Sequence, residues 1–440
     1  MKIGIQTWGT YGDIQPFAAL AGGLAAAGHD VTLAYSMVAH DSHKLLTEEA
    51  GFKAISVSDH FKVTPEMEQH FLDKVLTRWN MMTQLKIIFD AFLEPVRDEM
   101  YIAAKDLCMQ NDIVIGHFCV YPLAIAAEQH KVPRLAVALN HSALPSRHIT
   151  PPGAPPLGEW LNPLWWRIGR MLLDQAVGPP INRFRRQQGL SPVKNIMERV
   201  WCSKELTLVA VSPSLCKRQP DWDESIQVCG FLDLPEAHGT WQMPEELKLF
   251  FDHGEPPVFL SFGSMMPISP DNQKKAIELM TKAVKLAGCR AIIQSSVPEL
   301  ANRNPHEDIF FINRAPHSRI FPFCSAVVHH GGAGTTHSAL AAGCPSIVVA
   351  HVSDQMFWGN ELTRLGVGPK ILHRRSLTTE KLADRIRTTL NSRPMRQKAQ
   401  ALGQSMRKED GVGLAVRLIE HRFSRPAQPL TSDRSPGYRR

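Results

Sequence analysis

Residues 329–336 read HHGGAGTT, and this stretch decides the fold. A short apolar run, 325–328, comes directly before it, and a helical pattern of small residues, 338–342, follows. The order is strand, glycine turn, helix, and the glycines let backbone N–H groups approach a ligand closely because they carry no side chain. A helix that starts near Gly334 directs its free N–H groups and the positive end of its dipole at the turn. We therefore expect the turn to hold a phosphate group.

Polar side chains at the same turn support an anion site. Thr335 and Thr336 supply hydroxyl donors, and His330 supplies an imidazole. The alternative is that glycines at a strand–helix junction only form the turn, which is how we would interpret an isolated Gly-Gly pair. Here three glycines, two threonines and two histidines share eight residues, and a second polar pair, Asp354 and Gln355, follows the next predicted strand. The concentration of polar groups favours ligand binding.

The start of the chain predicts the opening of a doubly wound α/β sheet. An apolar strand at 2–7 leads into a loop with two glycines, a helix follows as far as Gly28, and a second strand is expected at 30–35. No G-x-G-x-x-G pattern occurs here, so a dinucleotide cofactor loses its main support. Asp13 lies in the loop after the first strand, where ligands of open α/β sheets bind.

Two long motifs resemble a known family. Residues 331–368, with the small-residue helix and the sequence Asp-Gln-x-Phe-Trp-Gly, resemble the donor-sugar motif of GT-B nucleotide-sugar glycosyltransferases. The stretch 9–31, GTYGDIQPFAALAGGLAAAGHDV, is similar to the same branch, which contains sterol glucosyltransferases, antibiotic aglycone glycosyltransferases and the rhamnolipid rhamnosyltransferase. The resemblance implies an α/β protein of GT-B fold, with two facing Rossmann-like, doubly wound domains and a cleft between them.

The length of 440 residues allows two domains of ordinary size. We expect an N-terminal acceptor-binding domain at 1–230, a linker at 231–256 and a C-terminal nucleotide-sugar-binding domain at 257–408. A last helix, 409–423, is expected to pack back on the N-terminal domain. Residues 424–440 are rich in Arg, Pro and Ser and are expected to be disordered.

The composition, with 44% hydrophobic and 21% charged residues, is typical of a globular protein. Eight cysteines without a C-x-x-C pair argue against a zinc ribbon or a disulfide framework and favour a reducing compartment. The first residues show no secretory signal, and no run of eighteen apolar residues occurs, so we expect a cytoplasmic protein, with peripheral membrane contact left open. The net charge of +7 suits an anionic donor, nucleic acid or a membrane surface, and does not choose among them.

The resemblance also implies roles for individual residues. Asp13 matches the aspartate proposed in this branch as the base that deprotonates the acceptor hydroxyl. His117 follows a predicted strand, 112–116, and is the candidate to contact the acceptor or to orient Asp13. Asp354 and Gln355 match the pair that binds the sugar hydroxyls. The other expected donor-binding residues are Ser264, Ala315, His330, Gly331, Gly332, Ala333, Gly334, Thr335 and Thr336.

Each role has a structural alternative. Asp13 could serve only the helix dipole, worth under about 1 kcal/mol, and a helix N-terminus should lower its pKa and weaken it as a base. His117 could be a surface or structurally bonded histidine, and Asp354 could cap a helix. Tyr11 stands where the family often has a basic residue, a difference that would alter acceptor preference or loop contacts.

We expect no metal and no cofactor besides the donor. Four histidines, His317, His329, His330 and His337, raise the question of zinc, but a zinc site needs a specific tetrahedral set, and the glycine context favours phosphate. Residues 221–223 read Asp-Trp-Asp, a pattern that can ligate a divalent cation. They lack a strand–motif–strand context, so we interpret them as a solvated turn.

Residues 160–188 mix tryptophans and other apolar residues with five arginines. A basic amphipathic helix of this kind can lie on an anionic membrane; we favour the alternative of a helix packed on its own sheet with its arginines in solvent. Stacking of nucleic-acid bases is a third interpretation without other support, and no nucleic-acid partner is expected. Residues 61–107, rich in methionine and aromatic residues, match the acceptor region of the family and predict an apolar acceptor.

The expected function is that of an inverting glycosyltransferase. It would move a hexose, with UDP-glucose as the leading donor, to a hydroxyl of a sterol, polyketide, carotenoid or lipid. The alternatives are a dTDP-deoxysugar donor such as dTDP-rhamnose, an epimerase of the nucleotide sugar, and a non-catalytic partner subunit that binds a sugar nucleotide. A nucleic-acid-binding protein would rest on charge alone.

Overall fold

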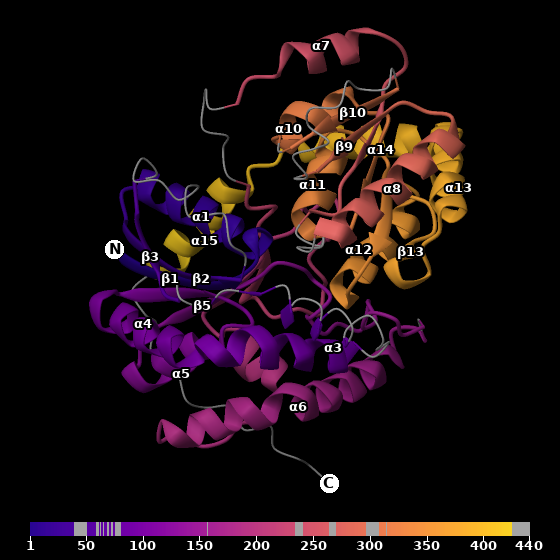
Figure 1. Ribbon diagram of the computed structural model, residues 1–440. Helices are drawn as coiled ribbons and strands as arrows, with labels where there is room; N and C mark the ends of the chain where they lie inside the picture. The colour runs from indigo at the N-terminus through magenta and orange to yellow at the C-terminus, as the bar shows by residue number, and fades with distance from the viewer. Residues whose placement is uncertain are drawn as a thin grey trace.

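In the computed structural model, two parallel β-sheets form the centres of two α/β domains, which lie side by side (Figure 1). This confirms the expected fold class. The structure describes residues 1–38, 51–58, 61, 63–64, 66–67, 70–71, 74, 81–155, 157–233, 241–263, 270–295, 308–313 and 315–424. Residues 425–440, most of the tail expected to be disordered, therefore lie outside the described part.

The N-terminal sheet has seven strands in the order β3-β2-β1-β4-β5-β6-β7, all parallel. The strand order reverses between β1 and β4, so the loops that follow these two strands meet at the switch point of the sheet. The strands are β1 (Lys2–Gly9), β2 (Asp30–Met37), β3 (Lys53–Ser56), β4 (Ile113–His117), β5 (Arg134–Ala138), β6 (Leu206–Val209) and β7 (Ile226–Val228).

The C-terminal sheet has six strands in the order β10-β9-β8-β11-β12-β13, again all parallel. Its switch point lies between β8 and β11, and the glycine turn at 329–336 directly follows β11. The strands are β8 (Val258–Leu260), β9 (Ala291–Gln294), β10 (Ile309–Ile312), β11 (Ala326–His329), β12 (Ser346–Ala350) and β13 (Leu372–His373).

Helices cover both faces of each sheet, as parallel strands require. The N-terminal domain contains α1 (Tyr11–Ala26), α3 (Met81–Ile88), a π-helical turn (Phe89–Leu93), a 3-10 turn (Glu94–Val96), α4 (Arg97–Gln110), α5 (Tyr121–His130), α6 (Asn162–Gln187) and a second π-helical turn (Met197–Trp201). The rest of the chain contains α7 (Glu245–Asp252), α8 (Pro270–Ala287), α10 (His317–Ile320), α11 (Ala333–Ala341), α12 (Ser353–Leu365), α13 (Thr379–Leu390), α14 (Arg393–Met406) and α15 (Gly411–Ser424), with 3-10 turns at Phe321–Phe323 and Arg374–Ser376.

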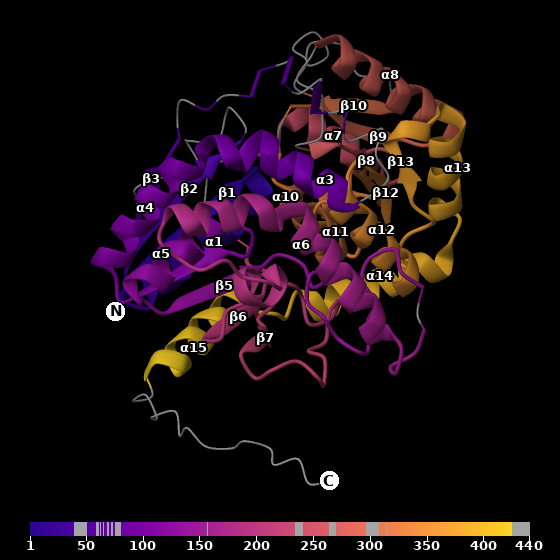
Figure 2. The same cartoon turned by 90° about the horizontal axis from the view of Figure 1, so that it is seen from below.

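The last helix returns to the first domain. Ala415 and Ile419 of α15 are fully buried in the same apolar cluster as Phe17 and Leu20 of α1. Figure 1 shows α15 on the same side of the N-terminal sheet as α1, and Figure 2 shows it beside β6. The region expected as a linker, 231–256, contains a helix of its own, α7. It is amphipathic and buries Leu247 in the C-terminal domain.

The two domains share an apolar contact. Val209 and Val211, at the end of β6, pack in one cluster with Leu340 of α11 and with Val348 and Trp358 of the C-terminal domain. Buried apolar side chains from both sheets therefore fix how the carboxyl ends of β1 and β11 face each other. Within the described residues, no helix is long and apolar enough to cross a membrane.

Candidate functional site

The loop after β1 holds Asp13 in one position. Thr10 is the N-cap of α1, and Asp13 is the third residue of the helix. The N–H and the hydroxyl of Thr10 both donate to Oδ2 of Asp13, at 2.8 Å and 3.0 Å. Gly9 has φ +133°, and a Cβ built there would lie 2.4 Å from the same oxygen. The Asp13 carboxylate can therefore occupy this position only because residue 9 is a glycine.

Burial raises the pKa of Asp13 to about 6, against the hydrogen bonds from Thr10, and the charge of Asp354 raises it further. We expected the helix N-terminus to lower this pKa, and that expectation is wrong. Removal of water from the carboxylate outweighs the favourable dipole and hydrogen bonds. Asp13 is consequently a stronger base than an ordinary aspartate and is still mostly ionised at pH 7.

Asp354 comes from the other domain. It is the second residue of α12, directly after the strand β12, and it lies close enough to Asp13 for their charges to interact. Desolvation by the surrounding protein raises the pKa of Asp354 as well, although its side chain is exposed, while backbone N–H groups at the start of α12 oppose the shift. The structure thus brings together two residues that the sequence placed in separate motifs.

The side chain of Gln355 also caps this helix. Oε1 of Gln355 accepts the backbone N–H groups of His351 at 2.8 Å and Val352 at 3.2 Å. The oxygen is therefore engaged, and the amide nitrogen is the group left to donate to a ligand. The side chain of Gln355 therefore shares the start of α12 with the Asp354 carboxylate, which accepts backbone N–H groups of the same turn.

The glycine turn encloses the ring of His330. A Cβ at Gly332 would lie 2.4 Å from Nε2 of this ring, and a Cβ at Gly263 would lie 2.8 Å from Cε1. Nδ1 of His330 is buried without a hydrogen-bond partner among the described residues. Burial, assisted by the charge of His317, lowers the pKa of His330 to about 4. At neutral pH this imidazole is uncharged, so it can act on an anion only as a hydrogen-bond donor.

The start of α11 is open. Its N-cap is Gly332, no side chain caps it, and its first turn contains no acidic residue. The first N–H groups of such a helix have no partner within the helix and attract an anion. Four buried polar atoms near this turn also lack a partner in the described structure: His329 Nε2, His330 Nδ1, Thr336 Oγ1 and His351 Nε2. Buried groups of this kind normally find partners, and a bound phosphate would supply acceptors for those that donate.

The structure gives less support to a ligand-binding or catalytic role for the other expected site residues. Ser264 lies outside the described residues, and Ala315 is a buried apolar residue beyond β10. The ring of His117 is buried against Phe17, and its Nδ1 accepts the N–H of Cys119 at 3.3 Å. Burial lowers the pKa of His117 to about 3, and no described interaction joins it to Asp13.

The residue beside Asp13 is instead Cys119. Burial and the charge of Asp13 raise the pKa of its thiol, so the thiol stays protonated. A lone cysteine in a loop gave no signal in the sequence. The role expected of His117 stays a prediction, and its geometry favours a structural contribution to the floor of the site.

His337 and the Asp-Trp-Asp sequence have structural roles. His337 contacts the carbonyl of Ala333 through Nδ1 at 2.7 Å, accepts the N–H of Ser212 through Nε2 at 3.3 Å and stacks on Phe231 at 4.2 Å. Asp221 accepts hydrogen bonds from residues 146 and 147 of its own domain, in accordance with a turn. Within the described ranges, no group of three His, Cys, Asp or Glu residues is placed to hold a metal ion. Independence from metal stays a prediction.

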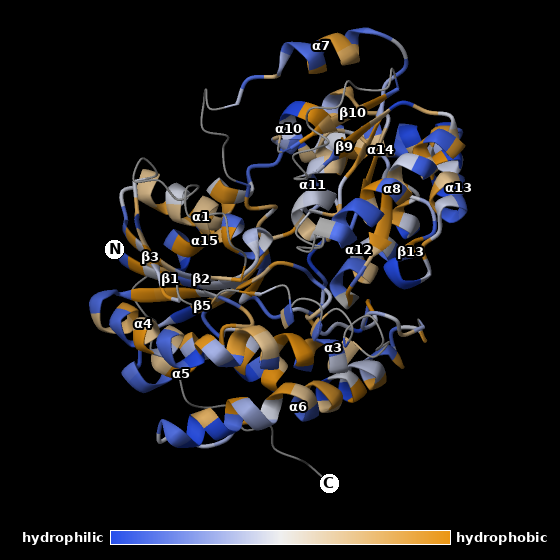
Figure 3. Ribbon diagram, in the orientation of Figure 1, coloured by the Kyte–Doolittle hydropathy of each residue, from blue (hydrophilic) through white to orange (hydrophobic). Residues whose placement is uncertain are grey.

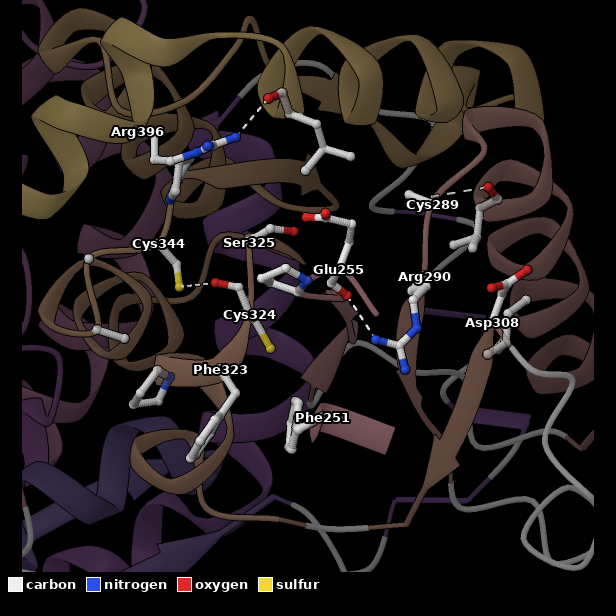
Figure 4. A pocket seen from close by; sticks show the side chains of 18 of the residues that line it. Phe251, Glu255, Cys289, Arg290, Asp308, Phe323, Cys324, Ser325, Cys344 and Arg396 are labelled. Carbon is white, nitrogen blue, oxygen red and sulfur yellow. Dashed lines mark hydrogen bonds between the residues drawn. The ribbon is translucent and has the colours of Figure 1, made fainter. Parts of the chain in front are cut away.

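A hollow of about 1190 Å³ lies at the opposite end of the C-terminal sheet (Figure 4). It is lined by residues that precede the strands, among them Glu255, Arg290, Asp308 and Ser325. Ligands of open α/β sheets bind at the carboxyl ends of the strands. The hollow is therefore separate from the glycine turn and is not the expected donor site.

The fold and the two loops define a class of two-domain α/β proteins in which a carboxylate on one sheet faces an anion-binding helix start on the other. Comparison with known proteins agrees. Residues 3–137 match the glycosyltransferase family 28 N-terminal domain, and residues 280–411 match the erythromycin biosynthesis protein CIII-like C-terminal domain. The chain is thus a glycosyltransferase of GT-B fold, similar to sterol and antibiotic glycosyltransferases.

Individual relatives span different lengths. A sterol 3-beta-glucosyltransferase of Arabidopsis thaliana is 29% identical over 95% of this chain, which spans only 65% of that relative. O-mycaminosyltylonolide 6-deoxyallosyltransferase of Streptomyces fradiae is 29% identical over 99% of this chain and 100% of its own length. The structure of the glycosyltransferase SsfS6 of Streptomyces sp. SF2575, complexed with thymidine diphosphate, has a TM-score of 0.63 at 18% identity, over 96% of this chain and 99% of that one. The last similarity shows the fold.

Proposed function

We propose that this protein is an inverting glycosyltransferase that moves a hexose, in the first place glucose, from a nucleoside diphosphate sugar to a hydroxyl of an apolar acceptor. The observation that carries the proposal is that Asp13 of one domain and Asp354 of the other lie close enough for their charges to interact. Each carboxylate follows a strand of a parallel sheet. One lies in the first turn of α1, in the acceptor-side domain, and the other lies beside the open start of α11.

In the proposed reaction, Asp13 takes the proton of the acceptor hydroxyl. The acceptor oxygen then attacks the anomeric carbon from the face opposite the diphosphate, and the bond from that carbon to the diphosphate oxygen breaks. An α-linked donor gives a β-glycoside. The pKa of about 6 suits this role, because the base is ionised at neutral pH and still holds a proton better than an ordinary aspartate.

The departing diphosphate gains negative charge. The N–H groups at the start of α11, the hydroxyls of Thr335 and Thr336, and the neutral ring of His330 would donate hydrogen bonds to it. Asp354 would accept hydrogen bonds from the sugar hydroxyls, and the amide nitrogen of Gln355 would donate one. We propose that these groups suffice without a metal ion.

The donor and acceptor are proposed from the relatives. UDP-glucose is the first candidate because the chain is similar to sterol glucosyltransferases over nearly its whole length. A dTDP-deoxysugar is the second, because the Streptomyces fradiae relative is named as a deoxyallosyltransferase. The corresponding acceptors are a sterol and a macrolide aglycone.

The test has two stages. Melting temperature is first measured with UDP-glucose, UDP, dTDP-glucose, dTDP-rhamnose and NAD, each with and without magnesium, since a ligand of the folded state raises it. The shifting donor is then incubated with a sterol or a macrolide aglycone, and the glycoside and its anomeric configuration are determined. We expect a magnesium-independent shift with one nucleotide class, followed by a β-glycoside. No shift with any nucleotide sugar would refute the proposal, and donor conversion without an acceptor would indicate an epimerase.

A further inference from the structure

The outward face of α6 and of the segment before it is unusually apolar. Trp160 is 94% exposed, the highest value among the exposed large apolar residues of the described chain. Seven of those fourteen residues belong to this one segment. We call them the apolar stripe: Leu157, Trp160, Leu161, Leu164, Ile168, Met171 and Leu172. Scattered exposed apolar residues are normal in proteins, but a continuous patch marks an interaction surface.

The stripe is not the core face of the helix. That face is occupied by Trp166, Leu173, Val177 and Phe184, which are buried in the apolar cluster of the N-terminal domain. The indole N–H of Trp166 donates to a backbone carbonyl at 2.8 Å, which fixes the start of the helix. The packed helix that we favoured from the sequence is therefore present, and its opposite face is apolar as well. Figure 3 shows apolar residues along α6, which forms the lower edge of the domain in that view.

The exposed, unpaired charges on this helix are all positive. Arg167, Arg183 and Arg186 are exposed and form no ion pair among the described residues, while the other two arginines of α6 are paired with glutamates. The only acidic residue of α6 is Asp174. Both of its oxygens accept backbone N–H groups, from residues 195 and 196. The outward face of α6 thus combines an apolar stripe with unpaired cations. The segment before it contributes one exposed carboxylate, Glu159, which lies 3.0 Å from Nδ1 of His148.

We propose that the outward face of α6 binds the surface of an anionic lipid bilayer. Tryptophan is favoured at the boundary between lipid tails and headgroups, and unpaired arginines are attracted to anionic headgroups. A helix that is apolar on one side and basic beside it lies in this interface rather than crossing it. A second copy of the chain fits less well, because two such faces would bring unpaired arginines together.

The position of α6 determines which domain would lie against the bilayer. The helix packs on α3, and both helices contact the cluster that contains Trp8, the residue before Gly9 in the Asp13 loop. Binding through α6 would place the acceptor-side domain against the bilayer. This consequence, unlike the docking itself, rests on the proposed function, and it would favour acceptors that reside in membranes.

The test uses the whole chain and vesicles, with no donor or acceptor present, so that its result is separate from that of the glycosyltransferase assays. Co-sedimentation is measured with vesicles of phosphatidylcholine alone and of phosphatidylcholine with an equal amount of phosphatidylglycerol. We expect binding to the anionic vesicles that weakens as salt is added. The double variant Trp160→Ser, Leu164→Ser should lower the partition coefficient by roughly tenfold or more. Leu249→Ser is the matched control, because this residue is half exposed on α7 of the other domain.

A second variant separates the two parts of the surface. Changing Arg167, Arg183 and Arg186 together to Gln should lower binding to anionic vesicles by roughly tenfold or more, at about 1 kcal/mol per arginine near the surface, and should remove most of the salt dependence. All these positions are exposed, so the melting temperature should stay the same and show that the variants fold. Absence of binding to anionic vesicles, or full binding by the stripe variant, would overturn the proposal. So would a dimer in light scattering that the stripe variant converts to a monomer.

Discussion

The starts of α1 and α11 are built alike and are used differently. Each follows the strand at which the order of its parallel sheet reverses. In α1, Thr10 and Asp13 bond to each other, so the helix start is occupied by its own carboxylate. In α11, the N-cap is Gly332 and no acid is present.

The difference divides the chemistry between the domains. The N-terminal helix start holds a negative charge, which can accept a proton from a hydroxyl. The C-terminal helix start leaves its N–H groups free for a negative charge that arrives with the ligand. One local structure thus produces a base on one side and an anion site on the other, and the choice depends on which side chains stand at the N-cap and three residues later.

Removal of the carboxylate charge should have the largest effect. Asp13→Asn keeps an oxygen that can accept the N–H of Thr10, so the loop should be retained, but the base is lost. We expect the rate of transfer to fall by about a hundred- to ten-thousandfold. Donor affinity should stay within about twofold, because the donor groups lie in the other domain. Initial rates and calorimetric titration of the donor measure the two quantities.

The same variant tests whether the charge of the Asp13 carboxylate destabilises the folded protein. Since burial and Asp354 disfavour the ionised form of Asp13, its neutral replacement should unfold at the same or a higher temperature at pH 8. An Asp13→Asn protein that is folded and transfers sugar at a near-normal rate would show that another group is the base.

A methyl group at position 9 should displace the Asp13 carboxylate. Gly9→Ala places a Cβ 2.4 Å from Oδ2 of Asp13 and strains a backbone at φ +133°. We expect roughly a hundredfold loss of rate and a destabilisation of about 1–3 kcal/mol. Gly12→Ala is the matched control, since its nearest neighbour would lie 3.9 Å away. Equal losses in the two variants would mean that the loop tolerates no change at all and that the collision is not the cause.

An acidic residue can also be placed at the start of α11, so that this helix start resembles that of α1. Thr335 occupies in α11 the third helical position that Asp13 occupies in α1. Thr335→Asp should therefore supply the missing acid, stabilise the helix by up to about 1 kcal/mol and repel the diphosphate. We expect donor affinity to fall roughly tenfold, equivalent to about 1.4 kcal/mol. Thr335→Asn loses the hydroxyl without adding charge, and a similar loss of affinity in that variant would show that the hydroxyl, not the charge, matters.

The sequence predicted local structure well where a pattern is dense. The strand at 346–350 and the junction of strand, glycine turn and helix around 329–336 have the expected places, because apolar runs and glycines act over a few residues. It did not indicate α14, although Ser392 caps its start, because the pattern there is mostly polar. The motifs at 9–31 and 331–368 could each be aligned with a family, but the distance between them in the folded protein could not be predicted.

What escaped prediction depends on contacts between distant segments. The pKa of Asp13 rises because packing removes water and because Asp354 approaches from the other domain, and neither effect is visible in the motif at 9–31. The burial of His117 and the position of Cys119 are of the same kind. In Gln355, a residue chosen for ligand binding also has a capping role, which depends on the direction of one side chain.

The smallest expected effect concerns the hydroxyl of Thr10, which donates to Asp13 and lowers its pKa. Thr10→Val removes this bond but keeps the backbone N–H, so the pKa of Asp13 should rise above about 6. Because the base must be ionised, the rate falls on the acid side of this pKa, and the acid limb of the profile of kcat against pH should move upward by roughly half a unit to one unit. At pH 8 the variant should be nearly as fast as the natural protein, which separates a shifted pKa from a damaged loop. Thr10→Ser keeps the hydroxyl and should keep the profile, and an acid limb that stays in place in Thr10→Val would mean that it reports a group other than Asp13.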